Sequence, residues 1–568
     1  MLPQSCDRSG PRTLHLTASA KDLANNDSLS IPTVQMLQSR PHSTQQDSDE
    51  PHGHRRDGSM SNIAAVVDTA SGPVRGLRDS GFRIWRGIPY AEPPIRSLRW
   101  HAPVAPTPWD EVRAAVDFSA RAPQTLVQSL VPPGCAEPND SGTVFSEDCL
   151  YLNICTPDVD TGNGLPVLVW FHGGGFVWGS GPTFIGDGRG IAREKIVVVT
   201  VNYRLGALGF LRLDHILGED YLDSANCGLL DQIAALRWVR SNIAAFGGDP
   251  NNVSIGGVSA GGKSVANIMA SGRARGMFHR GIIHSGGDHV TTPDAAADLT
   301  ARLLEAANIP LSSPRKILEV PAHDLVSAQN AIAAGARATW VWRPMVDGRT
   351  LQSTPTVALA GGIAANVSVI AGVTRNEAGS YDLADPTAAE QAQDVLRAIF
   401  GESAVATWEH YVRAAGGDER HAGRTVLADE RYGIPTARLL AAQASYAPVW
   451  RFRFDAPTPG ASGDRNGFHG ADTPYLWDVA MESATPELAR TARHMRERWI
   501  SFITSGDPNQ QHLPRWHPYE PKTQSPVMLI DTEPTLERNP DHELHSLWND
   551  AAWIPGTWWP VQRSVQTA

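Results

Sequence analysis

A serine set between glycines is the first site in this sequence whose residue types could do chemistry. The pentapeptide GVSAG at 257–261 matches Gly-x-Ser-x-Gly, and it lies between a strand-like run at 253–257 and a helical run at 263–270. A sharp strand-to-helix turn forces its central residue into a strained backbone conformation, and flanking glycines leave room for that turn. The hydroxyl is then exposed beside a helix N-terminus, whose partial positive charge favours a developing oxyanion. In this context the pattern predicts that Ser259 is a nucleophile.

A run of three glycines follows an earlier strand, in FHGGGF at 171–176. Bare backbone N–H groups in such a loop can approach a substrate oxygen closely. A tight turn without further function and a phosphate-binding loop are the alternatives. A phosphate loop would continue with a Lys-Ser/Thr pair, whereas Phe176-Val177-Trp178 stands here. An oxyanion hole is the better interpretation.

The elements around these two motifs alternate between strand and helix. The continuous apolar runs at 165–171 and 195–203 are typical of strands buried on both faces of a parallel sheet. Further strands are expected at 253–257, 281–285, 367–373 and 448–454, and a helix at 228–247 that ends at a Gly-Gly pair. This alternation predicts an α/β protein with a mostly parallel central sheet and helices on both faces. Ligands of such sheets bind at the carboxyl ends of the strands, where both motifs fall.

Composition excludes several classes of function. Hydrophobic residues make up 41% and charged residues 19% of the 568 residues, with a net charge of −11, so a polyanionic nucleic acid is a poor partner. No apolar run approaches the roughly 18 residues of a membrane span, and no secretory signal pattern opens the chain. A cytoplasmic location is therefore expected. The oligomeric state stays open.

Five sparse cysteines do not form a disulfide framework. Cys135 and Cys149 could close a short loop in an oxidising compartment, but free buried thiols are favoured in a reducing cytosol. Residues 1–59 are rich in polar residues and Pro and lack apolar periodicity, so we expect a disordered N-terminal extension, and Met60 is a candidate for the true start. Residues 60–568 contain no linker or repeat and are predicted to form one catalytic domain.

The motif set resembles that of the type B carboxylesterases, the family that includes cholinesterases and bacterial para-nitrobenzyl esterases. The matching segments follow the family order over nearly all of 60–560 and include RGIPYAEPP (86–94), SEDCLYLN (146–153), HGGGF (172–176), NYRLGALGFL (202–211), FGGDPNN (246–252), GVSAGG (257–262), PMVDG (344–348) and GDPN (506–509). This resemblance implies an α/β-hydrolase fold and a serine carboxylesterase. It implies no metal and no cofactor.

The resemblance also supplies the partners of Ser259. Glu377, in GVTRNEAGSYD (372–382), matches the family acid, and His469, in GFHGADTPYLW (467–477), matches the family base. The oxyanion donors would be the backbone N–H groups of Gly174, Gly175 and Ala260. Ser285 matches a family serine that contacts the triad acid and holds it in place without touching the substrate. The resemblance also implies two buried ion pairs, Arg99–Glu147 and Arg204–Asp231.

Two departures from the family bear on the substrate. Val258 stands where the family commonly has a glutamate, and residues 121–145 lack the tryptophan on which cholinesterases hold a quaternary ammonium. We therefore predict that choline esters are poor substrates and that neutral, moderately apolar esters are preferred. A lipase, an amidase or a carbamate hydrolase would use the same triad. A non-catalytic binding module and the hormone-sensitive-lipase-like group are weaker alternatives, because all three triad residues are present and the acid is a glutamate.

Overall fold

The computed structural model describes residues 63–125, 144–160, 162–333, 338–379, 385, 387–457, 467–479, 481, 484–521 and 526–555. Contacts divide the chain into two units, Met1–Asp57 and Gly58–Ala568, and every described residue belongs to the second. The predicted disordered extension at 1–59 lies outside the described residues and stays a prediction.

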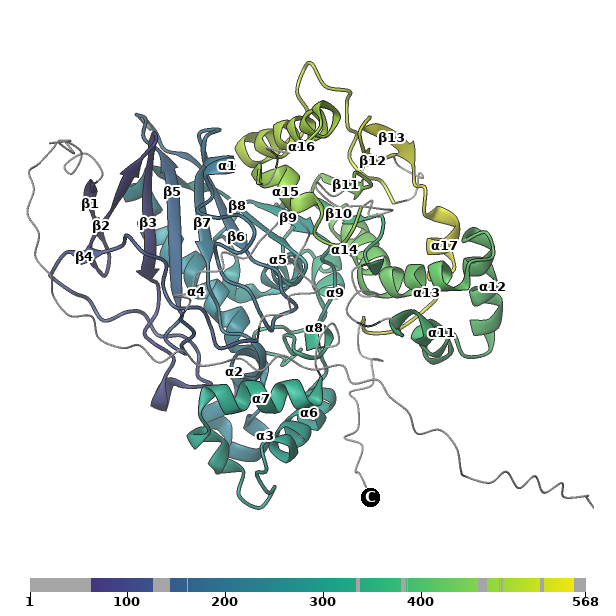
Figure 1. Ribbon diagram of the computed structural model, residues 1–568, viewed down its shortest axis with the longest axis horizontal. Helices are drawn as coiled ribbons and strands as arrows, with labels where there is room; N and C mark the ends of the chain where they lie inside the picture. Colours follow the sequence, from purple (N-terminus) through teal and green to yellow (C-terminus); the bar gives the residue numbers. More distant parts are fainter. Residues whose placement is uncertain are drawn as a thin grey trace, which may run out of the picture. The chain divides into compact units, whose positions relative to one another are not determined.

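Strands of the described residues form one sheet with a parallel centre and antiparallel ends (Figure 1). Strands β7, β6, β8, β9, β10, β11 and β12 are neighbours in this order, and each pair of them is parallel. Strands β1, β2, β3, β5 and β7 pair antiparallel at one end of the sheet, and β12 and β13 pair antiparallel at the other. The central strands were predicted from the sequence, whereas the antiparallel pairing at both ends of the sheet was not. The order is β1 (Ile63–Thr69), β2 (Gly72–Asp79), β3 (Phe82–Pro89), β5 (Tyr151–Pro157), β7 (Val197–Val201), β6 (Leu165–Phe171), β8 (Gly248–Val258), β9 (Arg280–His284), β10 (Ser368–Thr374), β11 (Val449–Phe454), β12 (Pro526–Ile530) and β13 (Thr535–Arg538), with the short β4 (Arg113–Ala114) beside β2.

Side chains of the central strands alternate between two apolar cores, one on each face of the sheet. Along β6, Val167, Val169 and Phe171 belong to the core that contains residues of α4 (Cys227–Asn242) and α5 (Ala260–Ala270). Leu168 and Trp170 belong to the other core, with residues of α16 (Pro486–Ser505). Burial on both faces explains why these strands read as continuous apolar runs. The predicted fold class, with helices on both faces, is confirmed.

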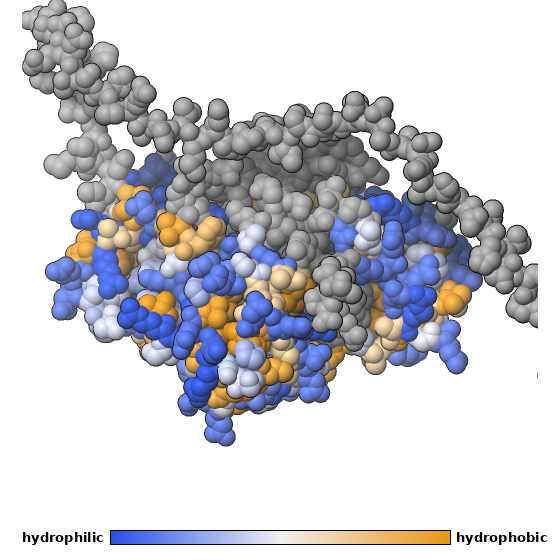
Figure 2. Space-filling model, turned by 60° about the horizontal axis from the view of Figure 1, so that its bottom comes forward, coloured by the Kyte–Doolittle hydropathy of each residue, from blue (hydrophilic) through white to orange (hydrophobic). Residues whose placement is uncertain are grey.

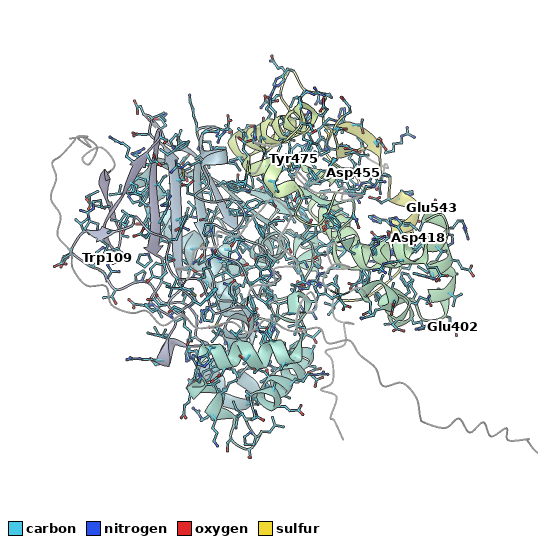
Figure 3. All side chains as sticks on the ribbon, in the orientation of Figure 1. Trp109, Glu402, Asp418, Asp455, Tyr475 and Glu543 are labelled. Carbon is cyan, nitrogen blue, oxygen red and sulfur yellow. The ribbon has the colours of Figure 1, made fainter. Side chains whose placement is uncertain are left out.

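Further helices lie outside this sheet and its two covering layers, and a third apolar cluster joins several of them (Figure 1). Acidic side chains such as Glu402, Asp418 and Glu543 lie at the outer edge of this group (Figure 3). The group consists of α11 (Ala392–Phe400), α12 (Ala404–Ala414), α13 (Glu419–Ala428), the π-helical turn η11 (Asp429–Gly433) and α17 (His542–Ser546). The helix that follows η11, α14 (Ile434–Gln443), packs instead against β10 and β11 of the sheet. Among the described residues, the other α-helices on the face that carries α4 and α5 are α2 (Gly206–Phe210), α3 (Asp214–Leu217), α6 (Pro293–Ala306), α7 (Ala322–Ile332), α8 (Ala338–Val341) and α9 (Pro355–Ala360), while α1 (Arg189–Ala192) and α15 (Asp472–Trp477) lie on the opposite face.

Both ion pairs implied by the family resemblance are present, but only Arg204–Asp231 is buried as predicted, whereas the Arg99 and Glu147 side chains are 12% and 15% exposed. Arg204 Nε donates to Asp231 Oδ2 at 2.8 Å, and both side chains are buried. Arg99 Nε donates to Glu147 Oε2 at 2.7 Å. The first pair ties the segment after β7 to α4, which carries Asp231. Removing one partner would leave a buried charge uncompensated and cost roughly 3–5 kcal/mol.

Cys149, Cys155 and Cys227 are free and buried, which agrees with the expected free thiols, while Cys6 and Cys135 lie outside the described residues. Within the described part of the chain, no helix combines the length and the apolar character needed to cross a bilayer. On the face seen in Figure 2, exposed apolar residues are interspersed with hydrophilic ones.

Candidate active site

Ser259 lies at the junction of β8 and α5, where the backbone turns most sharply. Its φ of 57° and ψ of −122° are strained for a residue with a side chain, whereas Val258 before it is still in the strand and Ala260 after it already begins the helix. The Ser259 N–H donates to His284 O at 2.8 Å, which anchors the turn to the end of β9. Such strain at a polar residue is typical of functional sites.

Two glycines make this turn sterically possible. A Cβ at Gly261 would lie 1.9 Å from the Phe171 carbonyl oxygen, and a Cβ at Gly257 would lie 2.4 Å from the Gly261 carbonyl carbon. Real Cβ atoms do not approach backbone atoms so closely. The glycines of the pentapeptide therefore allow β6, β8 and α5 to meet at Ser259.

The loop at 172–175 packs directly against this turn. A Cβ at Gly173 would lie 3.3 Å from the Ser259 Cβ, so no side chain separates the two segments. Gly174 and Gly175 have φ values of 104° and 61°, in the left-handed region that favours glycine. The predicted oxyanion donors thus come from two segments in contact, this loop and the first turn of α5, where Ala260 lies.

Glu377 and His469, far apart in the sequence, form a direct pair. His469 Nδ1 donates to Glu377 Oε2, and the Glu377 carboxylate is almost fully buried. Ser285 Oγ donates to the other oxygen, Oε1, at 2.6 Å, and the Thr374 N–H donates to the same atom at 2.7 Å. Because a carboxylate only accepts hydrogen bonds, these three donors fix its orientation.

The acid loop and the histidine loop are joined by their backbones. The Asn376 N–H donates to Gly467 O at 2.8 Å, and Asn376 and Phe468 form a short parallel bridge. Ser285 follows His284, which anchors Ser259. The carboxyl ends of β8, β9 and β10 therefore bring the four side chains predicted from sequence, Ser259, Ser285, Glu377 and His469, to one edge of the sheet.

A buried histidine beneath Ser259, His284, was not predicted from the sequence. His284 Nδ1 lies 2.6 Å from Asp472 Oδ2, and Trp499 Nε1 donates to His284 Nε2 at 2.8 Å. Since Nε2 accepts, Nδ1 must carry the proton and donate to Asp472. This trio fixes the strand residue whose carbonyl holds Ser259. The position of Asp472, three residues after His469, is the sequence signal that could have found it.

Aromatic and cationic side chains around His469 were also missed. The Tyr432 ring, on the π-helical turn η11, lies 4.9 Å from the His469 ring, and Lys263 Nζ lies 4.5 Å from the centre of the Tyr432 ring. Lys263 is four residues after Ser259 on α5 and is 1% exposed. A lysine in the otherwise small and apolar segment AGGKSVANIMA was the available signal.

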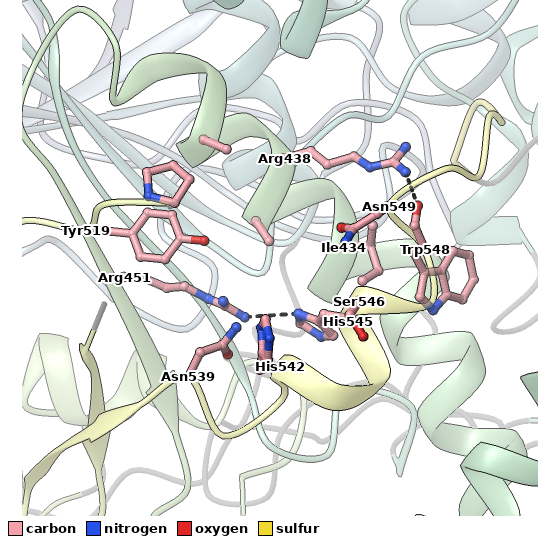
Figure 4. Close-up of a pocket in the computed structure, with 13 residues that line it drawn as sticks. Ile434, Arg438, Arg451, Tyr519, Asn539, His542, His545, Ser546, Trp548 and Asn549 are labelled. Carbon is pink, nitrogen blue, oxygen red and sulfur yellow. Dashed lines mark hydrogen bonds between the residues drawn. The ribbon is translucent and has the colours of Figure 1, made fainter. Parts of the chain in front are cut away.

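A separate cavity of about 380 Å³ lies among α14, α17 and β11 (Figure 4). Arg451 Nη2 and His545 Nδ1 face each other in it at 3.4 Å, and Arg438 Nη2 donates to Trp548 O at 2.5 Å. None of the residues predicted to be catalytic lines this cavity. It therefore gives no reason to move the candidate site away from Ser259.

The strained serine at the carboxyl end of a buried parallel strand, in a sheet covered on both faces, defines the protein as an α/β hydrolase. The model of the carboxylesterase family matches residues 63–548. Since that match spans most of the sequence, the chain belongs to the carboxylesterase family and is a carboxylic ester hydrolase.

Comparisons with individual proteins agree. The para-nitrobenzyl esterase of Bacillus subtilis (strain 168) is 34% identical over 495 residues, which cover 84% of this chain and 97% of that protein. The phenmedipham hydrolase of Pseudarthrobacter oxydans is 30% identical, over 84% of this chain and 98% of its own. A Geobacillus stearothermophilus carboxylesterase structure superposes with a TM-score of 0.74 at 32% identity, over 85% of this chain and 99% of its own.

Proposed function

We propose that this carboxylesterase hydrolyses small-molecule esters through an acyl-enzyme on Ser259, with His469 as the general base and Glu377 as its partner. The pairing of His469 Nδ1 with Glu377 carries the proposal, because it leaves Nε2 as the nitrogen that accepts the serine proton. Serine is a weak nucleophile until a base removes that proton.

The proposed reaction has two steps. Ser259 Oγ attacks the ester carbonyl while His469 takes its proton, and the same proton then passes to the leaving alcohol. Water, activated by His469 in turn, releases the acid from Ser259. Glu377 fixes the imidazole tautomer and stabilises the imidazolium. The N–H groups of Gly174, Gly175 and Ala260 bind the tetrahedral oxyanion more strongly than the ground-state carbonyl, so they act on the rate.

Replacing the nucleophile tests this proposal. We expect Ser259→Ala to lower kcat for para-nitrophenyl acetate by roughly 10⁶-fold, because the base then has no hydroxyl to activate. A fluorophosphonate probe should label the parent and not the variant. Hydrolysis by the variant at the parent rate, with an unchanged melting temperature, would refute the assignment of Ser259.

We further propose that the site disfavours cationic esters. Val258 carries no charge at the position beside the proposed nucleophile, and the buried guanidinium of Arg431, 5.6 Å from the centre of the Tyr432 ring that contacts His469, would repel a quaternary ammonium. The measurement compares kcat/KM for butyrylcholine with that for its uncharged 3,3-dimethylbutyl isostere. We expect the isostere to be hydrolysed at least tenfold better, and equal or better turnover of the cation would contradict this.

A further inference from the structure

Buried basic side chains gather beside the catalytic pair. The Lys263 ammonium and the His469 imidazole lie against the same ring, that of Tyr432, at 4.5 Å and 4.9 Å from its centre. The backbone of Lys263 is also tied to the nucleophile, since its N–H donates to Ser259 O at 2.9 Å. A buried lysine and the proposed base therefore contact the same aromatic ring.

Arg431 approaches the same place from the π-helical turn η11. Its guanidinium lies over the Trp340 ring at 4.5 Å and 5.6 Å from the Tyr432 ring centre, and Nη2 donates to Thr339 O at 2.7 Å. Thr339 in turn packs on the glycine loop, because a Cβ at Gly175 would lie 2.2 Å from the Thr339 Cβ. Arg431 is thus connected to the proposed oxyanion hole.

Two further basic groups, His289 and Arg343, lie close enough to Lys263 and Arg431 to interact with them electrostatically. The His289 imidazole stacks parallel to the ring of Phe176, which follows Gly175, with 6.1 Å between centres and 6° between planes. Neither ring nitrogen of His289 has a hydrogen-bond partner among the described residues, and the same holds for Arg431 Nη1 and Arg343 Nε. The side chains of His289, Arg343 and Arg431 are at least nine-tenths buried.

Two acids act on these four basic groups. Among the described residues, Glu430 and Glu377 are the acids that act on Lys263, and Glu377 is already bound by three donors. Burial and the neighbouring Arg431 hold the pKa of Lys263 well below its usual range, and burial together with Lys263 lowers that of His289. These lowered pKa values favour the neutral amine of Lys263 and the neutral imidazole of His289 while no anion is bound, and an anion that enters the cluster would favour their protonated forms.

We propose that Lys263, Arg431, Arg343 and His289 form an anion subsite beside Ser259, and that the substrate is an ester carrying a carboxylate or a comparable anion. This inference rests on the proposed function, because the subsite matters only if Ser259 is the nucleophile. It replaces the neutral ester expected from sequence, which followed from the missing glutamate at Val258 and overlooked the buried cations.

Matched pairs of esters test the charge preference on either side of the scissile bond. The acyl pair is para-nitrophenyl succinate and its methyl-capped counterpart, para-nitrophenyl methyl succinate. The alcohol pair is acetoxyacetate and the neutral acetoxyacetamide. With Ser259→Ala as the blank, we expect kcat/KM to be at least tenfold higher for the carboxylate member of one pair, and that pair identifies which half of the ester bears the anion.

Variants link the preference to the cluster. We expect Lys263→Met and Arg431→Gln each to lower the ratio of anionic to neutral kcat/KM at least tenfold. Lys316→Met, which removes an exposed lysine on a surface turn, is the matched control and should leave the ratio unchanged. An inhibition test on the parent enzyme does not depend on how the variants fold. Succinate should inhibit hydrolysis of a neutral ester competitively, with an inhibition constant at least tenfold lower than that of succinamide.

The outcomes separate the two proposals. Equal or slower hydrolysis of both carboxylate esters by the parent, with no excess inhibition by succinate, would overturn the anion subsite and leave Ser259 as the nucleophile. An unchanged ratio in folded Lys263→Met and Arg431→Gln would likewise overturn it. Undiminished hydrolysis by Ser259→Ala would overturn the proposed function itself.

Discussion

Glu377 accepts one hydrogen bond from each of three directions, and this determines what His469 can do. Ser285 and the Thr374 backbone hold Oε1, so Oε2 faces His469 Nδ1. The Nδ1 proton is therefore retained, and Nε2 is left with the lone pair that a general base needs. Hydrogen bonds to charged groups are worth about 1.5–3 kcal/mol each, which sets the scale of loss for each donor.

At this scale we predict that Glu377→Gln lowers kcat roughly 10⁴-fold, because an amide no longer stabilises the imidazolium or enforces the tautomer. Ser285→Ala retains the carboxylate and the Thr374 donor, so its kcat should fall only about tenfold to hundredfold. Steady-state kinetics with para-nitrophenyl acetate measure both. Equal losses in the two variants would contradict the separate role of the carboxylate.

The β8–α5 junction shows how elements, rather than single side chains, fix the conformation of Ser259, the proposed nucleophile. Ser259 holds its strained φ and ψ because β8 is hydrogen-bonded on both sides, to β6 and β9, while α5 packs directly on the strand behind it. The close approach of α5 to the Phe171 carbonyl requires a glycine at 261. Strain at the junction is thus supported by the central sheet on both sides.

Gly261→Ala should therefore destabilise the protein by more than about 3 kcal/mol, since the new Cβ would meet backbone that cannot move aside. Urea unfolding followed by circular dichroism measures the change. Gly272→Ala is the control, because a Cβ there meets nothing within 4 Å and φ is not positive. A Gly261→Ala protein as stable as Gly272→Ala would show that the elbow tolerates a side chain.

For the whole molecule, buried histidines link stability to pH. The His172 ring stacks on the Tyr203 ring, with 4.4 Å between their centres, and burial lowers the pKa of His172 to about 4. Burial also lowers the pKa of the partly buried His494 to about 4. In the unfolded chain a histidine takes up its proton near pH 6.5. Because the unfolded state then binds more protons than the folded state, stability decreases as the pH falls.

We predict that the free energy of unfolding falls between about pH 6.5 and pH 4, and that His172 alone accounts for roughly 3 kcal/mol of this loss. Above pH 6.5 the histidine is neutral in both states and adds no slope. Urea titrations at pH 7, 5.5 and 4.5 on the parent and on His172→Gln measure the difference. Parallel pH profiles for the two proteins would exclude His172 as a source.

Much of this protein could be read from its sequence, because the decisive signals are local. The buried strands at 165–171 and 281–285 and the glycines around Ser259 follow from backbone sterics and hydrophobic burial within a few residues. Glu377 and His469 were chosen through family resemblance, since a lone acid and one of 19 histidines carry no local signal. The strand order and the antiparallel pairing at the ends of the sheet could not be predicted from the sequence, because the hydrophobic periodicity of a strand does not indicate which other strands it pairs with.

Only the tertiary structure brought Lys263, His289, Arg343 and Arg431 together around Tyr432 and Phe176. The four residues are spread over positions 263 to 431 of the sequence, and each alone resembles an ordinary surface charge or core histidine. The sequence by itself determined the central strands and the turn at Ser259, and it is the source of the proposal that Ser259 is a nucleophile. The electrostatic environment of that nucleophile was decided by folding, because charge interactions depend on distance and burial, which no local pattern of residues specifies.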